Sequence, residues 1–126
     1  MRLLLDTNVV IRAVYEPERL PESIAATLRE PENEVFFSAV VIWELAIKSS
    51  LGKLPYHPEP ARRGLVARGF VEVPITARHG EETHGLPWLH RDPFDRIMIA
   101  QARVEGLILV TTDRHLARYD VQKLLV

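Results

Sequence analysis

The chain opens with the stretch MRLLLDTNVV, residues 1–10, in which three consecutive leucines run directly into Asp6. These leucines are typical of a buried strand, and the acid marks its end. The same order returns in LILVTTD, residues 107–113, where a second apolar strand runs into Asp113. In open α/β sheets, ligands bind in the crevice at the carboxyl ends of the strands. We therefore expect both acids at one site.

Length and composition predict one domain that spans residues 1–126. Of the 126 residues, 47% are hydrophobic and 26% charged, as in ordinary folded globular proteins. No apolar run approaches the roughly 18 residues that cross a bilayer, and no signal peptide is recognisable, so we expect a cytoplasmic protein without a membrane partner. The absence of cysteine excludes disulfides and thiolate metal sites.

Strand-like and helix-like segments alternate along the chain. Strands are expected at residues 2–6, 34–37, 70–75, 107–112 and 121–126, the last as an edge strand. Helices are expected at residues 9–15, 22–30, 39–51, 61–68, 76–85, 93–106 and 113–119. This alternation predicts an α/β fold with a central parallel sheet of four to five strands, flanked by helices on both faces.

Two further acids lie on expected helices. Glu44 stands in AVVIWELAIKS, which is apolar almost all round and therefore indicates a buried helix. Its carboxylate needs a cationic partner, for which Lys48 lies one turn away. Asp95 lies in the first turn of a helix, where the helix dipole favours an anion. Asp92, three residues earlier, is most simply the N-cap of that helix.

Each acid alone has a simple structural interpretation, since Asp6 and Asp113 can cap the helices that follow them. Together, however, three or four carboxylates in one crevice repel one another unless a divalent cation lies among them. A ligand set of oxygens suits Mg²⁺ or Mn²⁺, and such ions serve phosphate chemistry. No glycine-rich nucleotide loop is present, which favours an external phosphodiester as substrate. An enzyme that forms an aspartyl phosphate is the minor alternative, because its second acid is replaced by Asn8.

Four stretches in order resemble the successive motifs of PIN-domain nucleases. They are LLLDTNVVI, SAVVIWELAIK, DPFDRIMIAQA and LILVTTDRHL. The length makes the chain similar to the VapC-type toxins of type II toxin–antitoxin pairs. The resemblance implies a PIN fold, Mg²⁺- or Mn²⁺-dependent endoribonuclease activity on RNA, inhibition by a cognate antitoxin, and a homodimer. The alternative is a catalytically silent PIN domain that binds RNA or protein, and the retention of all four acids argues against it.

The resemblance also implies roles for individual residues. Asp6 and Asp95 would be the principal metal ligands, and Glu44 and Asp113 would complete the catalytic set directly or through water. Hydrogen bonds that orient these carboxylates are expected from Thr7, Asn8 and Thr112. Arg96 is a candidate for contact with substrate phosphate, with an exposed or ion-paired arginine as the alternative.

The histidines and tryptophans give weaker indications. The five histidines show no HExxH or other ligand spacing, so a histidine-bound zinc is not expected. His90 and Arg91 are candidates for lining the substrate groove, with solvated residues of a loop as the simpler alternative. Trp43 is expected in the core, whereas Trp88 is the better candidate for stacking on a base. The segment 17–30 and the helix around Trp43 are candidate contact regions for an antitoxin or a second subunit.

Overall fold

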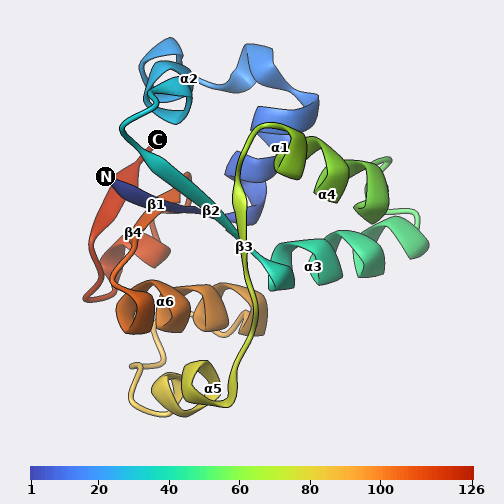
Figure 1. Ribbon diagram of the computed structural model, residues 1–126. Helices are drawn as coiled ribbons and strands as arrows, with labels where there is room; N and C mark the ends of the chain where they lie inside the picture. Colours follow the sequence, from blue (N-terminus) through green and yellow to red (C-terminus); the bar gives the residue numbers. More distant parts are fainter.

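The computed structural model describes residues 1–126 and contains one five-stranded sheet (Figure 1). All strand pairs are parallel, and the strand order is β3-β2-β1-β4-β5. The strands are β1 (Arg2–Leu5), β2 (Glu34–Ser38), β3 (Val71–Val73), β4 (Ile108–Thr111) and β5 (Lys123–Leu125). The α/β prediction with a parallel sheet is confirmed, including the edge position of the last strand.

Six α-helices connect the strands. They are α1 (Thr7–Tyr15), α2 (Glu22–Arg29), α3 (Ala39–Ser50), α4 (Pro58–Ala67), α5 (Ala77–Thr83) and α6 (Pro93–Glu105). Two short 3₁₀ turns, Pro17–Arg19 and Leu116–Arg118, complete the list, and the second replaces the helix expected at 113–119. Helix α4 begins three residues before the expected start at 61, because proline is well tolerated in the first turn of a helix. No helix is long and apolar enough to cross a membrane.

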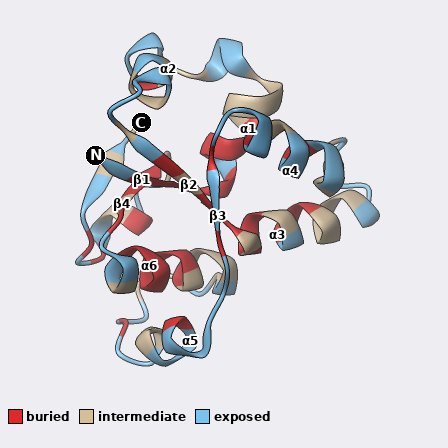
Figure 2. Cartoon of the chain, in the orientation of Figure 1, coloured by how far each residue is buried: buried red, intermediate tan, exposed pale blue.

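The first strand lies at the centre of the sheet and is buried on both faces (Figure 2). Successive side chains of a strand point to opposite faces, so Leu3 and Leu5 pack with residues of α1, α3 and α4. Leu4 faces the other side and packs with residues of α6, including Ile99 and Ala102. Helices thus cover both faces, and the three consecutive leucines of the opening stretch fill both cores.

The register of the sheet aligns the ends of its central strands. Leu5 pairs with Phe37 of β2 and Val110 of β4, so β1, β2 and β4 end at the same edge. Two helices begin directly there, α1 with Asp6 as N-cap and α3 with Ser38 as N-cap. The fold therefore brings the acid after β1, the start of α3 and the loop after β4 to one place.

Candidate metal centre

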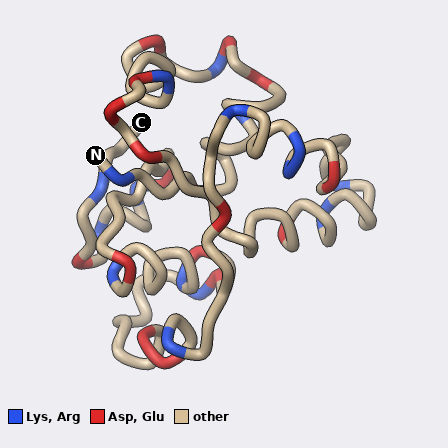
Figure 3. The backbone as a smooth tube through the Cα atoms, in the orientation of Figure 1, with Lys and Arg blue, Asp and Glu red and all other residues tan.

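A polar pocket of about 150 Å³ lies at the carboxyl edge of the sheet. It is lined by Asp6, Thr7, Asn8, Glu44, Lys48, Asp92, Asp95 and Asp113, with no apolar residue among them. The structure therefore brings together all four acids singled out in the sequence, from β1, α3, α6 and the loop after β4. Elsewhere, charges of both signs are interspersed along the chain (Figure 3), and the net charge is −1. The concentration of carboxylates is thus a local property of this pocket.

Asp6 is only 3% exposed and is held from several sides. Its Oδ1 accepts a hydrogen bond from the backbone N–H of Val9 at 2.9 Å, so Asp6 caps α1 as well as lining the pocket. Its Oδ2 accepts from the hydroxyl of Thr111, and the backbone N–H of Thr112 donates to the same carboxylate. Burial raises the pKa of Asp6 against these hydrogen bonds, and the nearby charge of Asp113 raises it further.

The hydroxyl that orients Asp6 belongs to Thr111, a residue that the sequence reasoning passed over. The expected Thr112 contributes its backbone N–H to Asp6 rather than its side chain. The Thr111 hydroxyl also accepts from the backbone N–H of Asp113 at 3.0 Å and so connects the two strand-end acids. The spacing Thr-x-Asp, typical of a turn closed by a threonine side chain, was the available signal.

Glu44 is buried on α3 and both of its oxygens are bound. Thr7 donates its hydroxyl to Oε1 at 2.6 Å, and Lys48 donates Nζ to Oε2 at 2.6 Å. The expected partner one turn along the helix is therefore present, and Thr7 orients a carboxylate as predicted. The hydrogen bond that Lys48 donates to Glu44 raises the pKa of Lys48 against the effect of its partial burial. This pair keeps one positive charge at the wall of the pocket.

Asp95 is positioned by the start of α6. Asp92 caps that helix, since its Oδ1 accepts from the backbone N–H groups of Phe94 at 2.8 Å and Asp95 at 3.3 Å, as expected. Burial, together with the charges of Asp92 and Glu44, raises the pKa of Asp95 to about 6, although a hydrogen bond with His90 lowers it. Asp95 is thus a carboxylate that the metal-free pocket ionises only with difficulty.

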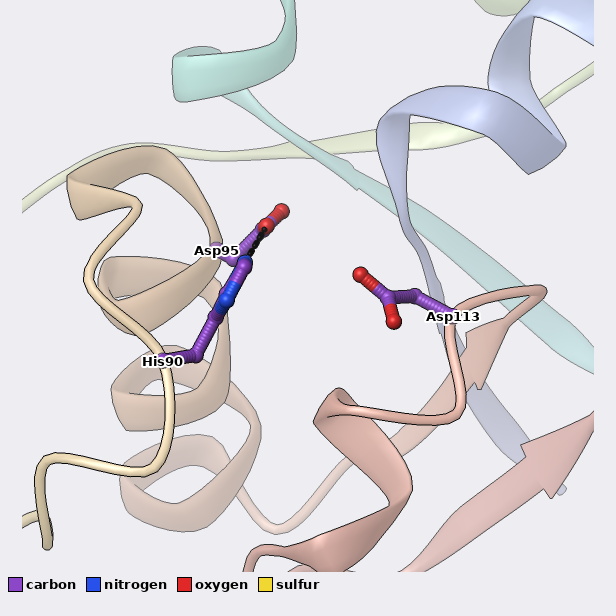
Figure 4. Close-up of side chains that lie close together, drawn as sticks. All are labelled: His90, Asp95 and Asp113. Atoms are coloured by element: carbon purple, nitrogen blue, oxygen red, sulfur yellow. Dashed lines mark hydrogen bonds and ion pairs between the residues drawn. The ribbon is translucent and has the colours of Figure 1, made fainter.

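His90, a candidate for the substrate groove in the sequence, contacts an acid of the pocket, a role that no ligand spacing indicated. Its Nε2 lies 2.8 Å from Oδ2 of Asp95, and the carboxylate of Asp113 faces this pair from the loop after β4 (Figure 4). One ligand atom from each of these three residues lies within 4.8 Å of the other two. Ligand-spacing rules missed His90 because a loop, rather than a helix face, brings it to the acids. The nearest signal was its position five residues before Asp95 in HRDPFD.

Arg96 has a role different from the ones expected. It is 5% exposed and has no acidic partner, so the expectation of an exposed or ion-paired arginine is wrong. Its two Nη atoms donate to backbone carbonyl oxygens of the loop before α6, those of Thr83, Leu86, Pro87 and His90, and to the Tyr119 hydroxyl. The guanidinium also stacks on Trp88, 3.7 Å from the ring centroid. Its donors hold this loop in place, which leaves them unavailable to a substrate phosphate.

The expectation that Trp43 lies in the core is also wrong. Val40, Val41 and Leu45 face the core from α3, whereas Trp43 lies on the outer side of the helix and is 58% exposed. Its ring meets that of Phe94 edge-on, with centroids 5.2 Å apart. The apolar sequence on all sides of this helix therefore reflects an exposed apolar face in addition to a buried one.

Two of the remaining candidates lie at the surface. Asn8 lines the pocket but is exposed and forms no side-chain hydrogen bond with a carboxylate. Arg91 is exposed in the loop before α6, and Trp88 in the same loop is 74% exposed beyond its contact with Arg96.

The donor set of the pocket fits a hard divalent cation. Five carboxylates face one small space that contains a single cationic side chain, Lys48. Two oxygens, Oδ1 of Asp95 and Oδ2 of Asp113, have no protein donor, whereas each oxygen of Asp6 and Glu44 is already oriented by one. Oriented carboxylates with free lone pairs are what a magnesium or manganese ion requires. The charge of such an ion would also offset the repulsion from Asp92 and Glu44 that raises the pKa of Asp95.

Comparison with known proteins assigns the fold and the family. The chain belongs to the PIN-domain family, whose model matches residues 3–122. Similar solved structures include VapBC2 from Rickettsia felis bound to a DNA fragment from their promoter, with a TM-score of 0.79 and 17% identity over 100% of this chain and 99% of that chain. DNA-bound VapBC from Salmonella typhimurium has a TM-score of 0.71 and 18% identity over 98% and 97% of the two chains. FitAcB from Neisseria gonorrhoeae has a TM-score of 0.55 and 24% identity, over 96% of this chain and 95% of that chain. No curated protein matches the chain in sequence.

Proposed function

We propose that this PIN domain is a Mg²⁺- or Mn²⁺-dependent endoribonuclease that acts as the toxin of a toxin–antitoxin pair. The observation that carries the proposal is the pocket in which Asp6, Glu44, Asp95 and Asp113 converge at the carboxyl edge of the sheet. The likeness in fold to solved VapBC complexes supports the toxin assignment.

A bound Mg²⁺ or Mn²⁺ ion would supply an activated water and would neutralise charge on the phosphate. Asp6 and Asp95 would hold this ion, and Thr111 keeps the Asp6 carboxylate in position. Glu44, fixed between Thr7 and Lys48, and the half-exposed Asp113 complete the set. The Lys48 ammonium, at the pocket wall, favours binding of the anionic RNA backbone.

A second polar pocket offers a path for the RNA strand. It measures about 190 Å³, contains Arg12 and Arg19, and shares Asn8 with the acidic pocket. Arg12 lies one helical turn after Asn8, about 6 Å along α1. Arg19 is paired with Glu16 at 2.7 Å, whereas Arg12 is half-buried and donates no side-chain hydrogen bond. Arg12 therefore takes the substrate-phosphate role in place of Arg96, whose two Nη atoms bond the loop before α6.

The antitoxin is expected at a larger groove away from the acids. This groove, of about 570 Å³, is lined by Ala13, Pro17, Leu20, Ala25, Leu28, Arg29, Arg68 and Phe70. Its floor is mostly apolar, with two arginines among its lining residues, which suits an amphipathic segment that carries acidic side chains. It includes part of the segment 17–30 that the sequence analysis named as a contact region.

A homodimer is expected through the outer face of α3. Trp43, Ile47 and Leu51 follow one another at intervals of four residues and so share one side of the helix. Trp43 and Leu51 are 58% and 62% exposed, and Phe94 adds its ring beside Trp43. Exposed apolar patches of this kind mark interaction surfaces. Sedimentation of the purified protein tests this expectation, which a monomer at all concentrations would contradict.

Cleavage of single-stranded RNA by the purified protein in Mn²⁺ tests the activity. We expect the wild type to cut, and Asp6→Asn to bind RNA without cutting it. The exposed Asp120→Asn serves as a control that retains activity. If the folded wild type binds RNA and leaves it intact, the catalytically silent module is the correct assignment.

Expression in a bacterial host tests the toxin assignment. Growth arrest is expected with the wild type and not with Asp95→Asn. A small protein encoded beside this chain is expected to relieve the arrest. An active nuclease that causes no arrest would contradict the toxin assignment while leaving the enzymatic one intact.

A further inference from the structure

We infer that His90 is a nitrogen ligand of the metal at this site, which makes the centre a mixed nitrogen–oxygen site that favours Mn²⁺ over Mg²⁺. The inference rests on the proposed metal dependence and adds a ligand from outside the four acids. Three observations carry it: the spacing of the ligand atoms, the rigid support of the imidazole, and its convergence with Asp95 and Asp113.

The separation of the ligand atoms of His90 and Asp95 fits two ligands of one ion. In an octahedral site with bonds of about 2.1 Å, two adjacent ligand atoms lie about 3 Å apart. Nε2 of His90 and Oδ2 of Asp95 are 2.8 Å apart, close to that separation. A hydrogen bond between two side chains accounts for this distance by itself. It does not account for the oxygen of Asp113, which approaches both to within 4.8 Å from the loop after β4 (Figure 4).

Contacts to the backbone and to the ring hold His90 in place. The backbone N–H of His90 donates to the Tyr119 hydroxyl at 2.9 Å, and Arg96 donates to the carbonyl oxygen of His90 at 3.4 Å. The ring lies parallel to that of His115, with centroids 5.9 Å apart and planes within 4°. Preorganised ligands lose little freedom when a metal binds, so these contacts favour ligation. The buried Arg96 therefore supports the site indirectly, because it holds the loop that contains His90.

A nitrogen ligand changes which ion the site prefers. Mg²⁺ takes oxygen ligands in a strict octahedron, whereas imidazole suits the later divalent ions of the first transition series. Mn²⁺ binds nitrogen-containing sites the least tightly of that series, but, unlike Mg²⁺, it accepts an imidazole nitrogen as well as carboxylates. With His90 added to the acids, the centre is therefore expected to bind Mn²⁺ more tightly than Mg²⁺, and to lose much of that preference without the imidazole.

Pulsed electron paramagnetic resonance of the Mn²⁺-loaded protein tests the ligand directly. We expect a nitrogen coupling of a bound imidazole in the wild type, its loss in His90→Ala, and its retention in His115→Ala, the matched control on the neighbouring ring. A wild-type spectrum without nitrogen coupling overturns the inference, and this result needs no variant to fold.

Calorimetric titration of the same proteins with Mn²⁺ and with Mg²⁺ tests the preference. In His90→Ala we expect the Mn²⁺ affinity to fall about tenfold or more, as for other losses at metal sites, and the Mg²⁺ affinity to change much less. Equal losses for both ions overturn the inference, because they assign His90 only an orienting role toward Asp95. Neither measurement uses RNA. Nitrogen ligation in a protein that cuts no RNA would refute the proposed function alone, and an active enzyme without nitrogen ligation would refute this inference alone.

Discussion

Replacing Asp95 with asparagine is expected to make the metal-free protein more stable while it removes activity. The folded pocket raises the pKa of Asp95 from 3.8 to about 6, chiefly through burial. Each pKa unit corresponds to about 1.4 kcal/mol, so the ionised carboxylate costs the folded state at most about 3 kcal/mol. Asparagine keeps an oxygen for His90 and removes the charge. Because the pocket opens to solvent, we expect a gain of about 1–2 kcal/mol at pH 7.5.

The sign of the pH dependence follows from the direction of the shift. Between pH 3.8 and about 6 the folded protein binds more protons at Asp95 than the unfolded chain does. The wild type therefore loses stability at this residue as the pH rises through that window. The advantage of Asp95→Asn is complete above about pH 6, falls by about half near pH 5, and disappears below pH 3.8.

Urea unfolding in EDTA, followed by tryptophan fluorescence at pH 7.5 and pH 5, measures this difference. Asp120→Asn, at an exposed position, is the control and is expected to change stability by less than about 0.5 kcal/mol at either pH. The reasoning is refuted if Asp95→Asn is no more stable than the wild type at pH 7.5. An advantage that is the same at both pH values would refute it as well.

Three further changes test the contacts around the site. Thr111→Val removes the hydroxyl that donates a hydrogen bond to Asp6 and should lower the free energy of unfolding in urea by about 1–3 kcal/mol. Thr112→Val leaves its backbone contact intact and should cost less than about 0.5 kcal/mol, so equal losses would contradict the assignment. Arg96→Met leaves several loop carbonyls without a donor and should cost about 2–4 kcal/mol, and a loss below about 1 kcal/mol would show that the loop does not depend on it. Arg12→Gln should weaken binding of single-stranded RNA in EDTA and reduce the slope of log affinity against log salt by about 0.7, whereas the exposed Arg63→Gln on α4 should leave the slope unchanged. Equal slopes for the two variants would remove Arg12 from the RNA path.

The sequence predicts the convergence of the acids because that convergence follows from the sheet itself. Parallel strands end at one edge, so an acid after β1 and another after β4 meet there whatever the loops do. Glu44 and Asp95 are placed by helix periodicity and by the capping residue Asp92, which are also local properties. The family resemblance and these local patterns agree, and the parallel sheet is confirmed strand by strand.

The features that the sequence did not predict depend on the path of a loop. His90 and Arg96 meet because residues between α5 and α6 fold back over α6, and no spacing rule describes that path. Of the two threonines, only Thr111 donates its hydroxyl to Asp6. The choice depends on where β4 ends, because Thr111 is its last residue. Trp43 was misplaced for a different reason. A helix that is apolar on all sides is buried either by its own core or by another molecule, and sequence hydropathy does not distinguish the two.

The most direct test of the account compares cleavage with metal occupancy in the same sample. Metal-stripped protein is titrated with Mn²⁺, and the bound ion and the rate of hydrolysis of single-stranded RNA are measured at each point. We expect a rate of zero in EDTA, a rate that rises in proportion to occupancy of the acidic pocket, and no cleavage at any occupancy for Asp95→Asn. Cleavage that persists without bound metal, or a filled site that leaves RNA intact, would contradict it.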